Sequence, residues 1–206
     1  MKKCVIVGGA DIKEYEKINE YINEGDFIVC CDCGTRHTEK LSVKPDLIVG
    51  DFDSSENPML SVETIVLPRE KDDTDTVFAV KEAVKRGFDE FLLIGVIGER
   101  FDHSMGNVSI LLYLDVLGIT AKIVDDFSEM EIVNDKVSYV DGTFKYFSLL
   151  NISGTAEGIT VIGAKYPLEN ASISCEYQYG ISNEVLPGET AEISVKQGRL
   201  LLVKIR

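Results

Sequence analysis

Residues 91–115 read FLLIGVIGERFDHSMGNVSILLYLD and contain the unit that decides the fold. A short, continuous apolar run at residues 91–94 is followed by apolar residues at helical spacing between residues 108 and 114. A second apolar run then comes at residues 121–124. Apolar runs separated by helices are typical of a mainly parallel sheet that is covered on both faces. This stretch therefore predicts an α/β layered architecture.

The same alternation extends back to the N-terminus and stops near residue 127. Earlier apolar runs lie at residues 5–7, 27–29, 47–49 and 64–67. Beyond residue 127 the runs are short and partly alternating, glycines separate them, and no long helical stripe occurs. Strands at this spacing are typical of an antiparallel sandwich or a small barrel. We therefore expect an α/β domain with a mainly parallel sheet over residues 1–127 and an all-β sandwich domain over residues 128–206.

Composition excludes several classes of protein. The chain has 206 residues, 45% of them hydrophobic, so it is not disordered throughout. It carries 21 Lys+Arg against 35 Asp+Glu, a formal net charge of −14, which argues against nucleic acid or an anionic membrane as a partner held by bulk charge. The N-terminal apolar run is too short for a signal peptide, and no stretch is long enough to span a bilayer. We therefore expect a soluble, cytoplasmic protein.

The cysteines do not form an obvious disulfide or metal-binding pattern. There are five, an odd number, and Cys30, Cys31 and Cys33 crowd into four positions. With only two histidines and no second cysteine pair, a structural zinc site is disfavoured. We expect buried, reduced thiols at the end of a strand.

Acidic side chains follow four of the predicted strands. In chain order they are Asp32, then Asp51 and Asp53, then Asp72, Asp73 and Asp75, then Asp102. Ligands of open α/β sheets bind at the carboxyl ends of the strands, so we expect these carboxylates at one edge. Crowded carboxylates repel one another, and a hard divalent cation such as Mg²⁺ relieves that repulsion. For any one motif taken alone a turn or a helix cap is the favoured explanation, for example a cap at Asp73 or Thr74, but four motifs together favour a binding site.

Arg100 is the predicted counter-cation for a phosphate. It follows Gly95-x-x-Gly98, where backbone N–H groups can approach a phosphate, and its planar guanidinium matches phosphate oxygens. His103 is interpreted as a hydrogen-bond partner of an aspartate in preference to a catalytic base, and Ser104 as a helix cap. In the second domain, Ser182-Asn183 can bind an organic ligand or form a hairpin turn, and residue chemistry alone favours the turn.

Together these motifs resemble the thiamine pyrophosphokinase family along nearly the whole chain. The matching segments are CDCG at 31–34, KPDLIVGDFDS at 44–54, KDDTD at 71–75, GVIGERFDH at 95–103, KYPL at 165–168 and GISNE at 180–184. The resemblance implies transfer of a pyrophosphoryl group from ATP to the hydroxyl of thiamine, giving thiamine diphosphate and AMP. It also implies Mg²⁺, a nucleotide-binding first domain, a thiamine-binding second domain, and a homodimer whose active sites lie between subunits.

The resemblance further implies roles for individual residues. The expected metal ligands are Asp51, Asp53 and Asp75, and the expected catalytic residues are these three with Asp72, Arg100 and Asp102. The expected ATP-binding residues are Asp32, Gly34, Asp51, Thr74, Arg100, Asp102 and His103, and the expected thiamine-binding residues are Asp72, Ser182 and Asn183. The chain departs from the family pattern at Cys33 and Glu99, where glycine is common, and it has no tryptophan to stack on thiamine.

The implied mechanism is in-line attack of the thiamine hydroxyl on the β-phosphorus of ATP, with AMP leaving. Such transfers depend on positioning and charge neutralisation more than on covalent catalysis. Two alternatives stay open. The chain could be a diphosphokinase for another hydroxymethyl heterocycle such as a pterin, or a non-catalytic sensor of a nucleotide or of thiamine diphosphate.

Overall fold

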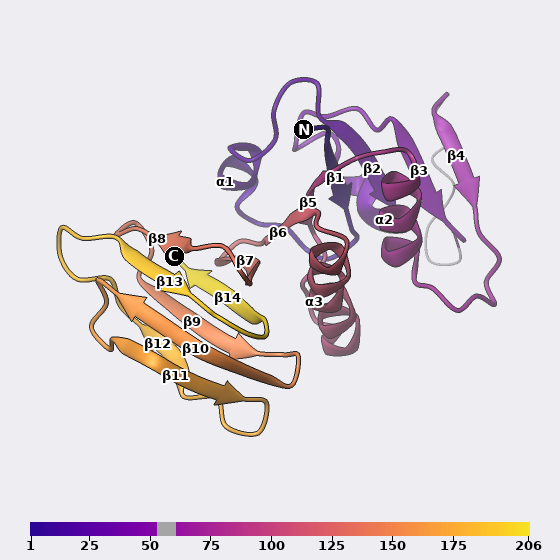
Figure 1. Ribbon diagram of the computed structural model, residues 1–206. Coiled ribbons are helices and arrows are strands. Elements are labelled where there is room, and N and C mark those ends of the chain that lie inside the picture. Colours follow the sequence, from indigo (N-terminus) through magenta and orange to yellow (C-terminus); the bar gives the residue numbers. More distant parts are fainter. Residues whose placement is uncertain (53–60) are drawn as a thin grey trace. The chain divides into compact units, whose positions relative to one another are not determined.

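The computed structural model describes residues 1–52 and 61–206 and divides the chain into two compact units, Met1–Asp126 and Phe127–Arg206. In the described ranges, the helices all belong to the first unit and the second unit consists of strands and loops (Figure 1). The expected combination of a mainly parallel sheet with a separate antiparallel sheet is confirmed.

Parallel strands form the centre of the first unit. They are β1 (Lys3–Val7), β2 (Phe27–Cys31), β3 (Leu47–Gly50), β4 (Glu63–Val66), β5 (Glu90–Ile94) and β6 (Thr120–Val124), in the order β6-β5-β1-β2-β3-β4. The helices are α1 (Tyr15–Asn19), the 3₁₀ helix η1 (Asp32–His37), α2 (Asp75–Lys85) and α3 (Phe101–Val116). The strand order reverses between β1 and β5, which is where ligands of open α/β sheets bind.

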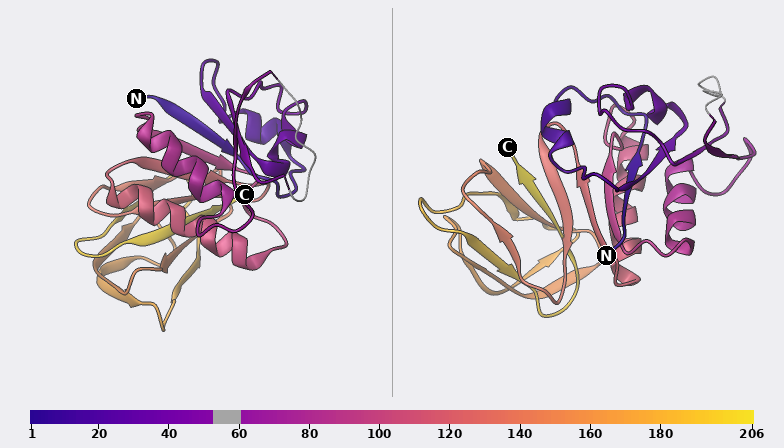
Figure 2. Two further views of the ribbon diagram at one scale, coloured as in Figure 1. Left: turned by 90° about the vertical axis from the view of Figure 1, so that its right-hand side faces the viewer. Right: turned by 90° about the horizontal axis from the view of Figure 1, so that it is seen from above.

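Both faces of this sheet are covered, which explains why its strands are apolar throughout. Val5 and Val7 of β1 belong to a buried cluster that includes Ile18 of α1. Cys4 and Ile6 alternate with them and are also fully buried, so they face the opposite side. Helix α2 contacts β1, β2 and β3, helix α3 contacts β6, and the two helices lie side by side (Figure 1, Figure 2). The continuous apolar runs thus reflect burial on two faces.

The second unit contains two antiparallel groups of strands. One has the order β12-β9-β14-β7 and the other the order β11-β10-β13-β8. The bounds are β7 (Ser128–Val133), β8 (Ser138–Val140), β9 (Tyr146–Asn151), β10 (Thr155–Ile162), β11 (Leu168–Ser174), β12 (Gly180–Asn183), β13 (Ala191–Ser194) and β14 (Leu200–Ile205). Phe147 of β9 and Leu202 of β14 share one buried cluster with Ile159 of β10 and Ile193 of β13. Side chains from both groups of strands therefore build a single core.

Helix ends follow the local sequence closely at α2 and less closely at α1. The Thr74 hydroxyl accepts a hydrogen bond from the Val77 N–H at 3.3 Å and caps α2, and Gly87, at φ 84°, follows its end. The apolar spacing through Ile22 predicts a longer α1 than the observed Tyr15–Asn19. This helix has no side-chain cap at its N-terminus and is too short to be stable alone, so packing of its apolar residues maintains it.

The thiols of the first unit are inert where they are buried. Cys4, Cys30 and Cys31 are free and buried, and burial raises the pKa of Cys4 and of Cys30 to about 12. The expectation of buried, reduced thiols at a strand end is confirmed for Cys30 and Cys31, whereas Cys33 lies in η1 and is partly exposed. Within residues 1–52 and 61–206, no helix is both long enough and apolar enough to cross a membrane.

Candidate active site

The segments that follow β1, β2 and β5 pack main chain against main chain. A Cβ atom at Gly8 would lie 2.5 Å from the Gly95 carbonyl oxygen, and one at Gly34 would lie 2.1 Å from the Val7 carbonyl oxygen. Both approaches are closer than any side chain allows, so only glycine fits at these positions. Gly34 was expected to bind ATP, and its packing of η1 onto β1 is a sufficient structural reason for a glycine there.

Asp32 lies at the junction of β2 and η1, beside the end of β3. Its φ of 42° is in the left-handed region, which aspartate tolerates better than most residues. A Cβ atom at Gly50 would lie 3.1 Å from the Asp32 Cα atom, so the residue before Asp51 is in close contact with Asp32. Two of the predicted acidic strand ends therefore adjoin.

Lys71 joins two of the predicted metal ligands. Its ammonium group forms an ion pair and a hydrogen bond with Asp51, at the end of β3, and it lies 3.1 Å from Oδ1 of Asp75, in the first turn of α2. All three side chains are mostly buried, with 17% of Lys71, 11% of Asp51 and 20% of Asp75 exposed. The fold thus brings together carboxylates that are separated by 24 positions in the sequence (75 − 51 = 24).

Burial and the ion pairs shift the pKa values of this cluster in opposite directions. Burial raises the pKa of Asp75, the Lys71 ion pair opposes that shift, and the charges of Asp51 and Asp32 add to it, so the pKa remains above its ordinary value. Burial lowers the pKa of Lys71, but its contacts with the Asp51 and Asp75 carboxylates outweigh burial and raise it. An ion pair alone would depress the pKa of Asp75. The net rise means that burial, with the smaller contributions of Asp51 and Asp32, outweighs the ion pair with Lys71.

The donor set of this cluster suits a divalent cation. Carboxylate oxygens are the preferred protein ligands of Mg²⁺. In this cluster, carboxylate oxygens of Asp51 and Asp75 already lie around one positive charge, the Lys71 ammonium. Oδ1 of Asp75 is buried and makes no hydrogen bond, because its contact with Lys71 is an ion pair outside hydrogen-bond geometry. Within the described residues, no three His, Cys, Asp or Glu side chains are grouped as a metal site. Asp53, the third expected ligand, lies outside the described residues.

Other residues of the KDDTD motif have separate places. Asp72 is exposed, Asp73 forms an ion pair of 2.7 Å with Lys81, and Thr74 caps α2. The motif therefore combines helix initiation with the acidic cluster, since its first residue, Lys71, forms ion pairs with both Asp51 and its last residue, Asp75.

Arg100 pairs with a neighbour in the sequence. Its Nε atom donates to Asp102 Oδ1 at 2.9 Å and its Nη2 atom to Oδ2 at 2.7 Å, and both side chains are about two-thirds exposed, at 70% and 66%. The bond from Arg100 lowers the pKa of Asp102. His103 is exposed beside this pair. The pair presents a guanidinium group at the start of α3, close in the sequence to the Gly95–Gly98 turn.

Ser104 corrects one expectation. It lies within the first turn of α3, where Arg100 is the N-cap residue and makes no side-chain cap. The Ser104 hydroxyl accepts a hydrogen bond from the Gly98 N–H at 3.0 Å and donates one to the Gly98 carbonyl at 3.2 Å. Ser104 therefore fastens the glycine turn to the helix and does not cap the helix.

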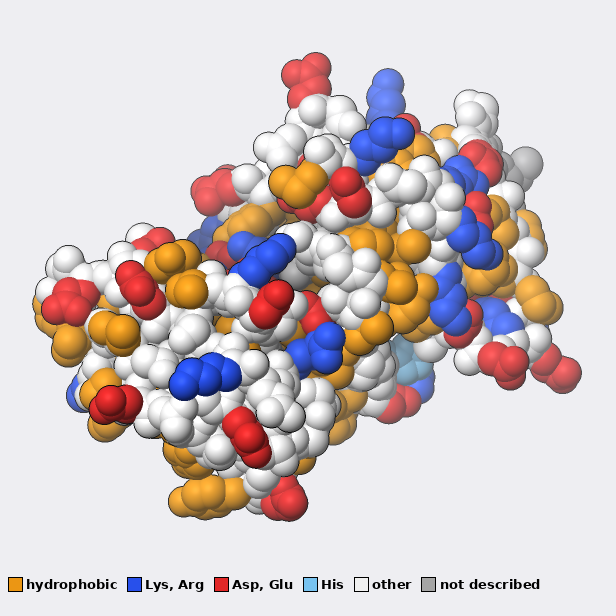
Figure 3. Space-filling model, viewed as in Figure 1, with side chains coloured by type: hydrophobic (Ala, Val, Ile, Leu, Met, Phe, Trp, Pro, Cys, Tyr) orange, Lys and Arg blue, Asp and Glu red, His pale blue; other side chains and the backbone are white. Residues whose placement is uncertain are grey.

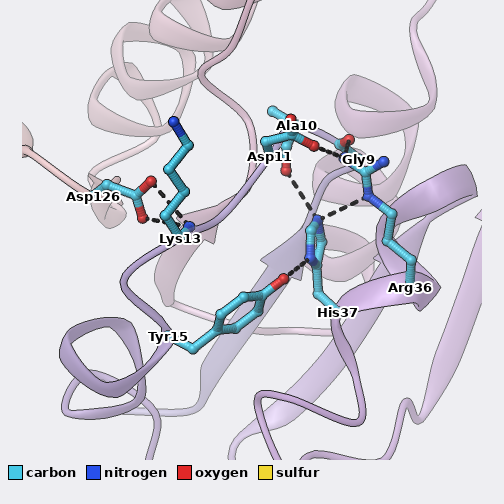
Figure 4. Close-up of polar contacts among 8 residues, drawn as sticks. All are labelled: Gly9, Ala10, Asp11, Lys13, Tyr15, Arg36, His37 and Asp126. Carbon is cyan, nitrogen blue, oxygen red and sulfur yellow. Dashed lines mark hydrogen bonds and ion pairs between the residues drawn. The ribbon is translucent and has the colours of Figure 1, made fainter.

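A second polar cluster at the same edge escaped the sequence analysis. Figure 4 shows that His37 of η1 points toward Tyr15 and Ala10. Its Nε2 atom lies 2.9 Å from the Ala10 carbonyl and 3.4 Å from the Arg36 Nε atom, and its Nδ1 atom lies 2.7 Å from the Tyr15 hydroxyl. Burial lowers the pKa of His37, and the nearby charge of Arg36 adds to that effect. The buried imidazole is therefore neutral and connects η1 to the segment after β1.

The remaining contacts of this cluster hold the same segment on its outer side. Arg36 donates from Nη2 to the Gly9 carbonyl and to the Asp11 carboxylate, both at 2.6 Å. Asp126 accepts from the backbone N–H groups of Lys13 and Glu14, at 3.0 and 2.9 Å (Figure 4). The partners are up to 113 positions apart in the sequence, which is why no spacing pattern reveals them. The local signal is that Arg36 and His37 follow the CDCG segment after a single residue, Thr35.

In the second unit, Asn183 and Ser182 differ in what they can offer a ligand. The Asn183 amide is buried and accepts from the Tyr166 N–H at 3.0 Å while donating to the Tyr166 carbonyl at 2.8 Å. Ser182 is exposed, at a φ of 59°. Asn183 thus holds the KYPL segment in place, and Ser182 presents its hydroxyl to solvent.

Comparison with known proteins agrees over both units. Residues 18–123 match a family described as "Thiamin pyrophosphokinase, catalytic domain", and residues 130–200 match "Thiamin pyrophosphokinase, vitamin B1 binding domain". Thiamine pyrophosphokinase of Bacillus subtilis is 26% identical over 212 residues, which cover 99% of each chain.

Solved structures show the same likeness. A thiamin pyrophosphokinase from Geobacillus thermodenitrificans has a TM-score of 0.84 and 28% identity and covers 99% of this chain and 97% of its own. The Bacillus subtilis structure has a TM-score of 0.87 and 24% identity, with 99% of each chain covered. Because the catalytic-domain family alone matches more than half of its length, the chain belongs to the thiamin pyrophosphokinase family.

Proposed function

We propose that this chain transfers the pyrophosphoryl group of ATP to the hydroxyl of thiamine and releases thiamine diphosphate and AMP. The observation that carries this function is membership of the family through two consecutive matches, to a catalytic domain and to a vitamin B1 binding domain. Neither a pterin diphosphokinase nor a non-catalytic sensor is favoured by these matches. The mostly buried acidic cluster at the strand ends supplies carboxylates that can bind a metal ion, and phosphoryl transfer needs such an ion to neutralise phosphate charge.

The two domains have separate roles in this proposal. Residues 1–127 bind the nucleotide and carry the catalytic carboxylates, and residues 128–206 form a β-sandwich that binds thiamine. The matched catalytic and vitamin B1 binding regions, residues 18–123 and 130–200, fall within these bounds. The core shared by both groups of strands in the second unit supports a sandwich.

Asp51 and Asp75, with Asp53, are the proposed ligands of Mg²⁺. When bound there, the ion neutralises charge on the polyphosphate. The carboxylates that would hold the ion follow β3 and β4, and Asp32 adds a further negative charge beside them. This explains how an acidic chain can bind a triphosphate, since the local carboxylates act through a cation.

Asp72 and Arg100 are proposed to act on the two substrates. The thiamine hydroxyl oxygen forms a bond to the β-phosphorus, the bond from that phosphorus to the bridging oxygen breaks, and AMP leaves with that oxygen. Asp72 is exposed at the strand ends and accepts the hydroxyl proton. Arg100 contacts the phosphates with Asp102 orienting its guanidinium group, and Thr74 and His103 flank the nucleotide.

Ser182 is proposed to bind thiamine directly, and Asn183 to support the same site. The exposed hydroxyl of Ser182 is available to a ligand, whereas the Asn183 amide is engaged with the backbone of Tyr166. Asn183 thus acts by fixing the segment around Tyr166.

A homodimer with active sites between subunits is also proposed. Helix α3 supports it with exposed apolar side chains that recur along its length, Phe101, Met105, Tyr113 and Val116. Figure 3 shows apolar side chains at the surface of this part of the molecule, with acidic and basic side chains interspersed around them. Light scattering of the purified protein gives the mass directly, and a monomer at enzyme-assay concentrations would contradict this part of the proposal.

The test of the function is AMP formation by purified protein with Mg-ATP, with and without thiamine, with the second product identified by mass. AMP that depends on thiamine, together with thiamine diphosphate, is the expected result. AMP formed only with another hydroxymethyl compound would mean that the enzyme uses the same mechanism on a different substrate. Tight binding of ligands without AMP from any acceptor would identify a sensor.

A further inference from the structure

The Lys71 ammonium occupies the position of a cation between two carboxylates. It contacts Asp51 from the end of β3 and Asp75 from the start of α2, and little of any of the three side chains is exposed. Lys81 provides a contrast within the same part of the chain. It forms its own ion pair, of 2.7 Å, with Asp73, but 41% of Lys81 and 34% of Asp73 are exposed to solvent.

The contact of Lys71 with Asp75 is held by charge alone. Oδ1 of Asp75 is buried, lies 3.1 Å from Nζ and has no hydrogen bond. A buried carboxylate oxygen without a hydrogen bond is costly, since folding has removed its water without a full replacement. This oxygen therefore gains more from a cation with fitting geometry than it gains from the lysine.

We propose that Lys71 is an exchangeable counter-ion, which holds Asp51 and Asp75 together in the metal-free enzyme and releases them when a divalent cation binds. This proposal rests on the assignment of Asp51 and Asp75 as metal ligands under the proposed function. It assigns to Lys71 a role distinct from theirs, because the lysine competes with the metal for the same oxygens.

The competition follows from distances and charges. A Mg²⁺ ion binds oxygen at about 2.0–2.1 Å, so an ion on the oxygens that Lys71 contacts would lie within a few ångströms of the ammonium. At such separations two positive charges repel strongly wherever water is partly excluded. The flexible four-carbon side chain allows the ammonium to move away, and the oxygens of a bound polyphosphate are acceptors that it can reach next. Lys71 therefore weakens metal binding in the absence of nucleotide.

The experiment compares the full-length Lys71→Met variant with wild type after removal of metals. The probe is Mn²⁺ without nucleotide, its free concentration followed by electron paramagnetic resonance. The variant is expected to bind Mn²⁺ about tenfold more tightly, a factor that corresponds to about 1.4 kcal/mol. The melting temperature in chelator should fall below that of wild type, because Asp51 and Asp75 then repel each other, and Mn²⁺ should raise it by more than it raises that of wild type.

Two further variants make the result specific. Lys81→Met removes the exposed lysine and should leave Mn²⁺ affinity at the wild-type value. Lys71→Gln removes the charge but can donate a hydrogen bond to a carboxylate, so it tests the proposal if Lys71→Met does not fold, and it too should bind Mn²⁺ more tightly.

Unchanged or weaker Mn²⁺ binding in folded Lys71→Gln or Lys71→Met protein would overturn the proposal and leave the metal site standing. If Asp75→Asn binds Mn²⁺ as tightly as wild type, the metal assignment fails, and the role of Lys71 fails with it. The two failures are therefore distinguishable, and neither depends on measuring turnover.

Discussion

The two basic–acidic pairs that follow β4 and β5 look alike in the sequence but differ in the fold. Lys71 is shared by Asp51 and Asp75 in a mostly buried cluster, whereas Arg100 and Asp102 pair with each other in solvent. Charges interact more strongly where water is excluded, so the first group constrains the site and the second is free to exchange partners. Burial, more than residue type, thus separates a charge that organises the site from one that can approach a ligand.

The largest expected effect comes from breaking the buried group. Asp75→Asn removes a charge that the proposed metal site needs while keeping the shape of the side chain. We expect kcat to fall at least about 10²-fold, the size of loss seen when one group that stabilises transition-state charge is removed. Steady-state AMP formation measures it, with circular dichroism to confirm the fold. Near-normal turnover would show that this carboxylate does not act in catalysis.

The exposed pair should separate activity from stability. Arg100→Ala is expected to lower kcat/KM about tenfold or more, because a charge-assisted contact to phosphate is worth about 1.5–3 kcal/mol. The free energy of unfolding should stay close to that of wild type, because the ion pair with Asp102 is exposed to solvent. Paired kinetic and urea-unfolding measurements test both statements. A large loss of stability with unchanged kcat/KM would show that this pair stabilises the fold and does not contact the phosphates.

Asn183 and Ser182 extend the same contrast to the second unit. Asn183→Ala removes two partly buried hydrogen bonds to the Tyr166 backbone and should lower the free energy of unfolding by about 1–3 kcal/mol. Ser182→Ala removes an exposed hydroxyl and should leave stability within about 0.5 kcal/mol of wild type. It should instead raise KM for thiamine. Equal stability losses in both variants would contradict the distinction.

The smallest effect is a pH dependence of stability that arises from one of the two histidines. Burial lowers the pKa of His37 from its ordinary value of 6.5, so the unfolded chain binds a proton more readily than the folded chain. The free energy of unfolding should therefore decrease as the pH falls below about 6.5. His37→Gln should flatten that decrease, because it removes the group that titrates. Denaturant titrations between pH 5 and 8 decide this, and an unaltered slope in His37→Gln would refute it.

Local patterns predicted the helices and strands of the first unit well because burial on two faces leaves continuous apolar runs. The apolar face of α2, its Thr74 cap and the glycine after its end all lie within fifteen residues, so each can be recognised from the local sequence. The length of α1 was predicted less well, because its apolar residues continue into non-helical chain that packs on the same core. Ser104 was predicted to cap the helix, but its hydroxyl bonds instead to Gly98, which precedes the helix.

By itself, the sequence determined the fold class, the grouping of acidic residues at strand ends and the resemblance to a family that transfers pyrophosphoryl groups. Those properties depend on the period of apolar residues and on motif order, both of which are written along the chain. Only the tertiary structure decided that Lys71 joins Asp51 to Asp75 and that His37 is neutral and contacts Tyr15. Which side chains meet, and how much water they lose, depends on contacts between distant residues, and no local spacing encodes those contacts.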